Sequence, residues 1–393
     1  MAALVALALA LAPVPAAAQK SPPKDLPAAS WILVDEREGD VLAKRHPRRA
    51  APTASTTKLM TAYLAIKALR PKDVVTAPRY RANPVESVLG LQPGERITVR
   101  DLLYGLLLAS GNDAAVALAR AVSGSQAAFV RRMNTTAAAL KLTDTRYEDP
   151  IGIGEGNVSS PRDLARLAAV LREIPLFRRI VDTPRATLTS GAVTRTVVNR
   201  NTLVRSVPWV DGVKTGYTLA AGNVLVASGE RRGVPLVSVV MGAPSEAARD
   251  AASLELLRYG ASLYERRSPV RKGEEFAAVP LRFRDERLPL LAARELLLVV
   301  RRDQKVETRV RAPEEVDGPI EEGEMLGRVT VLLDGERVAS AGLVAARSVE
   351  AAGLLDRVDS ALPGGRAVVW IGVVAVAGLI LIALLSAARR RRG

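Results

Sequence analysis

The segment Pro52-Thr-Ala-Ser55-Thr-Thr-Lys58-Leu-Met60 constrains the fold more than any other part of the chain. Its first residues suit a helix entry, and apolar residues then recur at helical spacing until Pro71. Positions i and i+3 share a helix face, so Ser55 and Lys58 are expected to touch. A serine needs a base to become nucleophilic, and a buried lysine has a lowered pKa. The spacing predicts a nucleophile and its base, with a capping serine beside a solvated lysine as the alternative.

Composition excludes several classes of site. The 393 residues suffice for two domains, and they include no cysteine and one histidine, His46. Disulfides, thiol catalysis and metal sites built on cysteines or several histidines are therefore excluded. His46 lies in an arginine-rich turn, so the base for Ser55 is expected to be a lysine. The formal charge is +15, but few aromatic residues are present for base stacking, so nucleic-acid binding is not expected. We predict no metal and no cofactor.

Both ends of the chain are apolar. Ala3 to Ala12, followed by Ala16-Ala-Ala18, predicts a secretory signal peptide over residues 1–18, with an uncleaved anchor as the alternative. Residues 19–29 are rich in proline and indicate a linker. Residues 367–388 carry no charge and are long enough to cross a bilayer, and the basic tail 389–393 is expected in the cytoplasm. We therefore predict a single-pass protein of the cell membrane whose bulk is extracytoplasmic; a buried core helix is the alternative.

Helical and strand patterns occur in blocks. Residues 30–267 begin with a hairpin pattern, continue with helical patterns and change to strand patterns near residue 186, which favours an antiparallel sheet packed with helices. Residues 268–346 contain short strand patterns separated by turns and predict a small β-rich domain. Residues 347–366 indicate an amphipathic linker helix. The predicted fold class is α+β, followed by a small all-β domain and a C-terminal transmembrane helix.

Three short motifs follow one another in the chain: Ser55-x-x-Lys58, Ser110-Gly-Asn112 and Lys214-Thr-Gly216. The first opens a helix, the second lies at a helix break, and the third lies on a strand. In this order they resemble the motifs of the penicillin-binding proteins and serine β-lactamases. Within that superfamily the chain resembles the low-molecular-weight D-alanyl-D-alanine carboxypeptidases over nearly the whole of its predicted secreted part. The resemblance implies a β-lactamase/transpeptidase-like catalytic domain over residues 30–267.

The resemblance also implies roles. Ser55 would attack the carbonyl of a D-Ala-D-Ala peptide, and Lys58 would accept its proton. Ser110 would relay a proton toward the leaving amine, and Asn112 would bind the substrate amide and Lys58. The substrate-binding candidates that the resemblance implies are Lys214, Thr215, Gly216, Tyr217, Arg200 and Arg249.

The last three of these candidates depend on particular arguments. Many relatives carry a histidine where Tyr217 stands; because the backbone N–H of this residue and that of Ser55 would bind the oxyanion, catalysis is expected to survive. Arg200 and Arg249 match arginines of the family and are candidates for the terminal carboxylate of the substrate, with solvated surface arginines as the alternative. Arg249→Ala is expected to weaken action on the free acid selectively.

The predicted function is a serine D-Ala-D-Ala carboxypeptidase that trims peptidoglycan stem pentapeptides through an acyl-enzyme on Ser55. Its expected partners are the stem peptide, β-lactam antibiotics and the membrane. A β-lactamase, an endopeptidase and an inactive envelope scaffold are the alternatives. One class of β-lactamase needs a glutamate-activated water, and Glu155 and Glu173 lie in the relevant stretch without the surrounding pattern. Gly152-x-Gly154-x-Gly156 lacks the helix of a phosphate loop and is interpreted as an ordinary loop.

Overall fold

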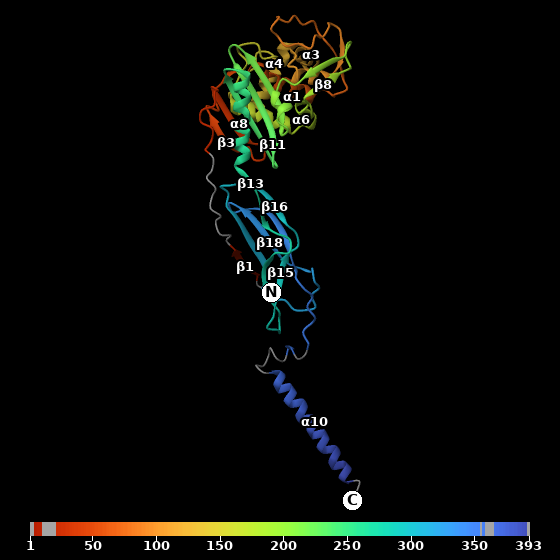
Figure 1. Ribbon diagram of the computed structural model, residues 1–393. Coiled ribbons are helices and arrows are strands. Elements are labelled where there is room, and N and C mark those ends of the chain that lie inside the picture. Colours follow the sequence, from red (N-terminus) through yellow and green to blue (C-terminus); the bar gives the residue numbers. More distant parts are fainter. Residues whose placement is uncertain (1–3, 10–20, 354–355, 358–364, 391–393) are drawn as a thin grey trace. The chain divides into compact units, whose positions relative to one another are not determined.

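The computed structural model describes residues 4–9, 21–353, 356–357 and 365–390 (Figure 1). The chain divides into two compact units, one comprising residues 18–264 and the other residues 1–17 with 265–393. The helices are η1 (Ala54–Thr57, a 3-10 helix), α1 (Lys58–Ala68), α2 (Val99–Leu107), α3 (Asn112–Ser123), α4 (Gln126–Ala139), α5 (Pro161–Arg172), α6 (Pro175–Val181), α7 (Thr202–Ser206), α8 (Glu246–Ser262) and α10 (Gly365–Arg390).

The strands of the first unit are β2 (Ser30–Asp35), β3 (Val41–Arg45), β4 (Ala51–Pro52), β5 (Val74–Thr76), β6 (Arg96–Thr98), β7 (Val158–Ser159), β8 (Arg185–Leu188), β9 (Arg195–Val198), β10 (Val210–Thr218), β11 (Gly222–Arg231) and β12 (Val234–Ala243). Strand β13 (Tyr264–Val270) begins at the boundary. Those of the second unit are β1 (Leu4–Leu9), β14 (Glu275–Pro280), β15 (Arg287–Ala292), β16 (Leu296–Arg301), β17 (Val306–Pro313), β18 (Met325–Leu333) and β19 (Glu336–Ala345).

The first unit is built on a five-stranded antiparallel sheet with the order β10-β11-β12-β2-β3. Strands β11 and β12 are buried almost continuously, as expected for a sheet covered on both faces. Val237 and Val239 belong to the core that includes α1, α2, α3 and α5. Leu236 points to the other face, where Gly260 of α8 leaves room for it. The prediction of an antiparallel sheet packed with helices is confirmed.

Local sequence explains where the helices of this unit begin. The side chain of Thr98 accepts a hydrogen bond from the N–H of Asp101 and caps α2, and Ser160 caps α5 through the N–H of Asp163. Such caps satisfy N–H groups that have no partner in the first helical turn. Helix α1 is buried around most of its circumference, which fits a helix at the centre of the domain. Its first turn therefore begins inside the protein and not at the surface.

The second unit contains a six-stranded sheet with the order β1-β17-β18-β19-β15-β14 and a separate pair, β13 and β16. Buried and less buried residues alternate along β17, which indicates one face on the core and one toward solvent. Leu288, Leu290, Val329 and Leu343 lie in a core of their own. The prediction of a small all-β domain after the α+β part of the chain is confirmed.

Several predicted segments lie partly outside the described residues. The predicted signal peptide, 1–18, overlaps β1, which pairs with β17, whereas 1–3 and 10–18 lie outside the described residues. Residues 354–355 and 358–364 of the predicted linker helix and residues 391–393 of the basic tail also lie outside the described residues. The signal peptide, the linker helix and the domain boundaries stay predictions.

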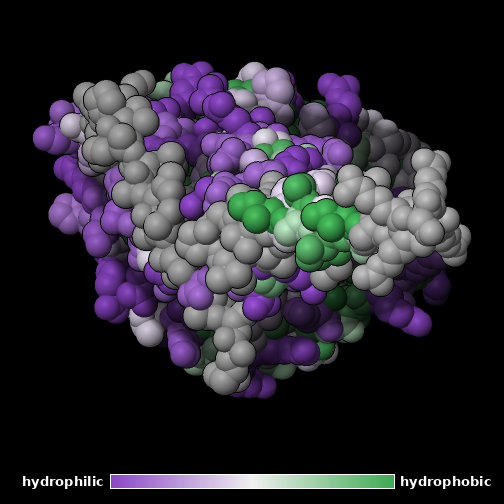
Figure 2. Space-filling model, turned by 90° about the horizontal axis from the view of Figure 1, so that it is seen from below, coloured by the Kyte–Doolittle hydropathy of each residue, from purple (hydrophilic) through white to green (hydrophobic). Residues whose placement is uncertain are grey.

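The predicted transmembrane helix over 367–388 is corrected by the structure. Among the described residues, no helix combines the length and the hydropathy that a membrane crossing requires. A crossing needs about 20 consecutive apolar residues, and the side chains of α10 are described only from Trp370 to Leu384. The prediction of a single-pass membrane protein with a cytoplasmic tail is therefore wrong. Figure 2 shows a mostly hydrophilic face, with apolar side chains near the middle of the view and toward its lower right.

Candidate active site

Ser55 and Lys58 lie together at the start of the central helix. Ser55 is in η1 and is partly exposed, whereas Lys58 begins α1 and is completely buried. Nζ of Lys58 lies 2.9 Å from Oγ of Ser55 and donates a second hydrogen bond of 2.7 Å to the carbonyl oxygen of Ile151. An amine at this distance from a hydroxyl can take its proton once the amine is neutral.

The surroundings of Lys58 favour that neutral form. Burial lowers the pKa of Lys58 to about 7, because an ammonium ion loses its hydration in the protein interior. The negative charges of Asp149, Glu86 and Asp113 raise this pKa, and the positive charge of Arg200 lowers it further. A base whose pKa lies near the operating pH is the most effective kind.

The loop of residues 148–157 supplies the other partner of Lys58. Oδ1 of Asp149 accepts from the N–H groups of Ile151 (2.7 Å) and Gly152 (2.5 Å), and Oδ2 accepts from Gly154 (2.7 Å). These bonds turn the carbonyl of Ile151 toward the lysine. Gly152 has a φ of +88°, and a Cβ atom there would lie 1.9 Å from the carbonyl oxygen of Ala54. The glycine pattern that we interpreted as an ordinary loop therefore packs directly behind Ser55.

The second motif meets the third through a hydrogen bond. Nζ of Lys214, on β10, donates to Oγ of Ser110 (3.1 Å) and to the carbonyl oxygen of Thr215 (2.9 Å). Ser110 lies between α2 and α3 with a φ of +65°, a left-handed conformation that non-glycine residues seldom adopt outside strained or functional positions. Burial, and then the charges of Lys58, Arg200 and Arg249, lower the pKa of Lys214 well below its ordinary value. The neutral form of Lys214 is therefore favoured, and Lys214 can exchange a proton with Ser110.

Strand β10 passes close to the predicted nucleophile. A Cβ atom on Gly216 would lie 3.0 Å from the carbonyl oxygen of Thr53 and 3.2 Å from the backbone nitrogen of Ser55, so glycine permits this approach. Strand β10 is also the end strand of its sheet, which leaves an edge for an extended peptide. Tyr217, the next residue, is 57% exposed.

Asn112 has a partner that we did not predict. Its Nδ2 donates to Oε2 of Glu86 (2.9 Å), and its backbone N–H donates to the carbonyl oxygen of Ser87 (2.8 Å). Within the described part of the chain, Lys58 bonds to Ser55 and Ile151 and not to Asn112. Nothing in the sequence distinguishes Glu86 from any other acidic loop residue, so this contact could not be found from the sequence.

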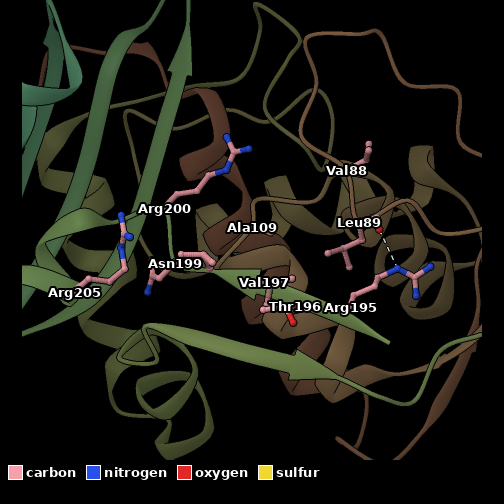
Figure 3. A pocket seen from close by; sticks show the side chains of 10 residues that line it. Val88, Leu89, Ala109, Arg195, Thr196, Val197, Asn199, Arg200 and Arg205 are labelled. Atoms are coloured by element: carbon pink, nitrogen blue, oxygen red, sulfur yellow. Dashed lines mark hydrogen bonds between the residues drawn. The ribbon is translucent and has the colours of Figure 1, made fainter. Parts of the chain in front are cut away.

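The two candidate arginines differ in their environments. Arg200 is exposed and lines an open cavity of about 580 Å³ next to Ala109. Figure 3 shows Arg195 turned toward Leu89, whose carbonyl oxygen accepts from it at 3.0 Å, with Arg200 on another side of the cavity. Arg249, in α8, is only 1% exposed, and its Nε lies 2.9 Å from Oδ1 of Asp250. The structure thus presents Arg200 to solvent and Arg249 to an internal ion pair.

Among the residues that the structure describes, no group of three or more histidine, cysteine, aspartate or glutamate side chains could hold a metal ion. Glu155 and Glu173, which were considered for a β-lactamase mechanism, are both exposed. The site thus brings each of two serines, Ser55 and Ser110, into contact with a buried lysine.

Known proteins share both units of the chain. Residues 16–245 match the family described as D-alanyl-D-alanine carboxypeptidase, and residues 264–351 match the C-terminal domain of penicillin-binding protein 5. The sequence is 34% identical to the D-alanyl-D-alanine carboxypeptidase DacA of Escherichia coli, over 82% of this chain and 83% of that protein. It is 31% identical to DacF of Bacillus subtilis, over 84% of this chain and 87% of that protein.

Solved structures show the same similarity. Penicillin-binding protein 5 from Haemophilus influenzae has a TM-score of 0.61 and 30% identity, with 84% of this chain and 100% of that chain covered. The DD-transpeptidase of Streptomyces K15 has a TM-score of 0.59 and 32% identity, with 62% of this chain and 100% of that chain covered. The match to the DD-transpeptidase covers a smaller share of this chain than the match to penicillin-binding protein 5.

Proposed function

We propose, from the premise that the chain belongs to the D-alanyl-D-alanine carboxypeptidase family, that Ser55 is the nucleophile of a serine hydrolase acting on peptides that end in D-Ala-D-Ala. The observation that supports this most directly is the 2.9 Å separation between Oγ of Ser55 and a buried Nζ of Lys58. The substrate class is peptidoglycan stem peptides, and β-lactams acylate the same serine.

Acylation follows from this geometry. Neutral Lys58 takes the proton of the Ser55 hydroxyl as Oγ attacks the carbonyl carbon between the two D-alanines. The tetrahedral oxyanion is held by the backbone N–H groups of Ser55 and Tyr217. Such donors stabilise the intermediate by roughly 3 kcal/mol each, and the close approach of Gly216 to the backbone of Ser55 brings the two segments together.

Departure of the terminal D-alanine requires a proton on its nitrogen. Ser110 is the proposed relay, because its hydroxyl already accepts a hydrogen bond from Lys214. The C–N bond breaks, D-alanine leaves, and the shortened peptide remains as an ester on Ser55. Water then hydrolyses the ester and restores the serine. With a β-lactam the broken bond belongs to a ring, so the leaving amine stays attached and deacylation is slow.

Mass spectrometry tests the nucleophile. Benzylpenicillin is expected to add covalently to Ser55, and proteolysis of the adduct should recover the label on the peptide that contains this residue. Ser55→Ala should abolish both the label and the release of D-alanine from a peptide ending in D-Ala-D-Ala. A label on another serine, or labelling of the alanine variant, would overturn the assignment. Hydrolysis of the adduct within seconds, with release of ring-opened penicilloic acid, would instead favour the β-lactamase alternative.

Recognition of the substrate carboxylate provides a second prediction. Arg200 is exposed beside the site, and a charge-assisted bond to a carboxylate contributes roughly ten- to a hundredfold in affinity. Arg200→Ala is therefore expected to lower kcat/KM by about this factor on a peptide acid, and to have little effect on the same peptide with an amidated terminus. Kinetics of both substrates on both proteins provide the measurement.

Arg249 serves as the comparison in that experiment. Because Arg249 is buried and paired with Asp250, we expect it to support the fold and not to bind the carboxylate, so its alanine variant is expected to lose activity equally on acid and amide. A loss restricted to the acid would instead assign carboxylate recognition to Arg249. Equal losses in the Arg200 variant would refute its proposed role.

A further inference from the structure

Glu86 lies in the long connection between β5 and β6, and its carboxylate accepts hydrogen bonds at both oxygens. Oε1 accepts from the backbone N–H (3.2 Å) and Nδ2 (3.1 Å) of Asn83. Oε2 accepts from Nδ2 of Asn112 (2.9 Å) and from the hydroxyl of Tyr80. Three of these donors belong to the connection itself, and the fourth belongs to the Ser-Gly-Asn motif. The carboxylate therefore joins the connection to the active site through one side-chain amide.

The connection is also held by contacts that do not involve this carboxylate. The backbone N–H of Asn112 donates to the carbonyl oxygen of Ser87 (2.8 Å). The carboxylate of Asp113 accepts from the N–H groups of Leu89 (2.9 Å) and Leu91 (3.0 Å). Removal of the glutamate charge alone thus leaves the connection anchored along the start of α3.

We propose that Glu86 is a positioning residue that fixes the orientation of the Asn112 amide, an inference that rests on the substrate-binding role proposed for Asn112. A side-chain amide has a donor side and an acceptor side. Because only its Nδ2 side can donate to a carboxylate, Glu86 holds Oδ1 on the opposite side, as an acceptor for an N–H group of the substrate. A flipped amide would place Oδ1 against the carboxylate and N–H groups against the substrate N–H.

Glutamine at position 86 has the same shape as glutamate but no longer favours one orientation of the Asn112 amide. The carboxylate accepts from Asn83 and Asn112 at the same time, whereas a glutamine amide accepts on one side only. Glu86→Gln is therefore expected to slow acylation by benzylpenicillin about tenfold, the factor for one charge-assisted hydrogen bond. Penicillanic acid lacks the acylamino N–H of benzylpenicillin, so its acylation rate is expected to stay close to native.

The pH dependence supplies a second signature. The negative charge of Glu86 raises the pKa of Lys58 against the effect of burial. Its loss lowers that pKa, so the midpoint of the acidic limb of acylation should move to lower pH. The other charges that act on Lys58 and remain in place are Asp149, Asp113, Arg200 and Lys214. This shift follows from the lost charge and shows that the carboxylate acts on Lys58, whereas penicillanic acid and Asn112→Ala show whether Glu86 acts through Asn112.

A double-mutant cycle tests whether Glu86 acts through Asn112. Acylation rates by benzylpenicillin are compared for the native chain, Glu86→Gln, Asn112→Ala and the double variant, with thermal unfolding as the control for folding. If Glu86 positions Asn112, the tenfold effect of Glu86→Gln disappears in the Asn112→Ala background. Asn83→Ala is the matched control, because it removes a donor to Oε1 and leaves the bond to Asn112 intact.

Three results would overturn the inference: a native rate for Glu86→Gln, an equal loss with penicillanic acid, or a tenfold loss that persists in the Asn112→Ala background. Failure of the native chain to form the Ser55 adduct would instead refute the proposed function. Labelling of the native chain in the same experiment therefore shows whether the Glu86 inference or the proposed function has failed.

Discussion

Replacement of Lys58 by arginine is expected to slow acylation by at least about a hundredfold, the lower end of the range for loss of a general base. Arginine keeps the positive charge but does not release its proton near neutral pH. The lysine, in contrast, has a pKa lowered to about 7 by burial and lies 2.9 Å from Oγ of Ser55. The measurement is the second-order rate constant for labelling by benzylpenicillin.

The pH profile of the native chain is the control for this prediction. Acylation requires neutral Lys58, and the neutral fraction increases as pH rises through the pKa of about 7. The acylation rate should therefore decrease as the pH is lowered through about 7. The rate of Lys58→Arg should not show this decrease. Near-native labelling by the arginine variant would show that the charge of residue 58, and not proton transfer, is what the reaction needs. A native thermal transition excludes misfolding as the cause of slow labelling.

The sequence predicted the parts of the site that depend on local periodicity. Ser55 and Lys58 are three apart at a helix start, and the structure brings them into hydrogen-bond contact. The residues that tune this pair lie far away in the chain. The carbonyl of Ile151 reaches Lys58 across 93 residues, and no periodicity relates a loop carbonyl to a helix that distant. The order of helical and strand blocks likewise predicted the sheet but not which loops would enclose the base.

Two surroundings could not be predicted from the sequence for a related reason. The glycine pattern at Gly152 was interpreted as a loop because no helix follows it, but the sequence does not show that this loop packs against the backbone of Ala54. Arg249 was predicted to bind the terminal carboxylate of the substrate, with a solvated surface arginine as the alternative; it is buried beside Asp250, a pairing between neighbours in α8 that composition alone does not reveal. In both cases the missing information was the identity of the facing atoms.

Gly152→Ala is expected to slow acylation by about a hundredfold, although residue 152 makes no contact with substrate in the proposed mechanism. Its Cβ would lie 1.9 Å from the carbonyl oxygen of Ala54 and 2.6 Å from the carbonyl carbon, so backbone must move. The movement separates the loop from η1, and with it the carbonyl of Ile151 from Lys58. A misplacement of about 1 Å in a catalytic group can cost a hundredfold in rate.

Gly39→Ala is the matched control for this last prediction. Gly39 has a φ of +76°, close to the +88° of Gly152, but nothing lies within 4 Å of the position that its Cβ would take. Both variants carry the cost of a left-handed alanine, about 1–2 kcal/mol, and only Gly152→Ala adds a collision behind Ser55. Thermal unfolding and the rate of labelling by benzylpenicillin should therefore separate the two effects. Both variants should melt earlier than the native chain, and only Gly152→Ala should label slowly. Equal labelling rates would mean that the loop adjusts without moving the carbonyl of Ile151, and the contact between that carbonyl and Lys58 would then not depend on glycine at position 152.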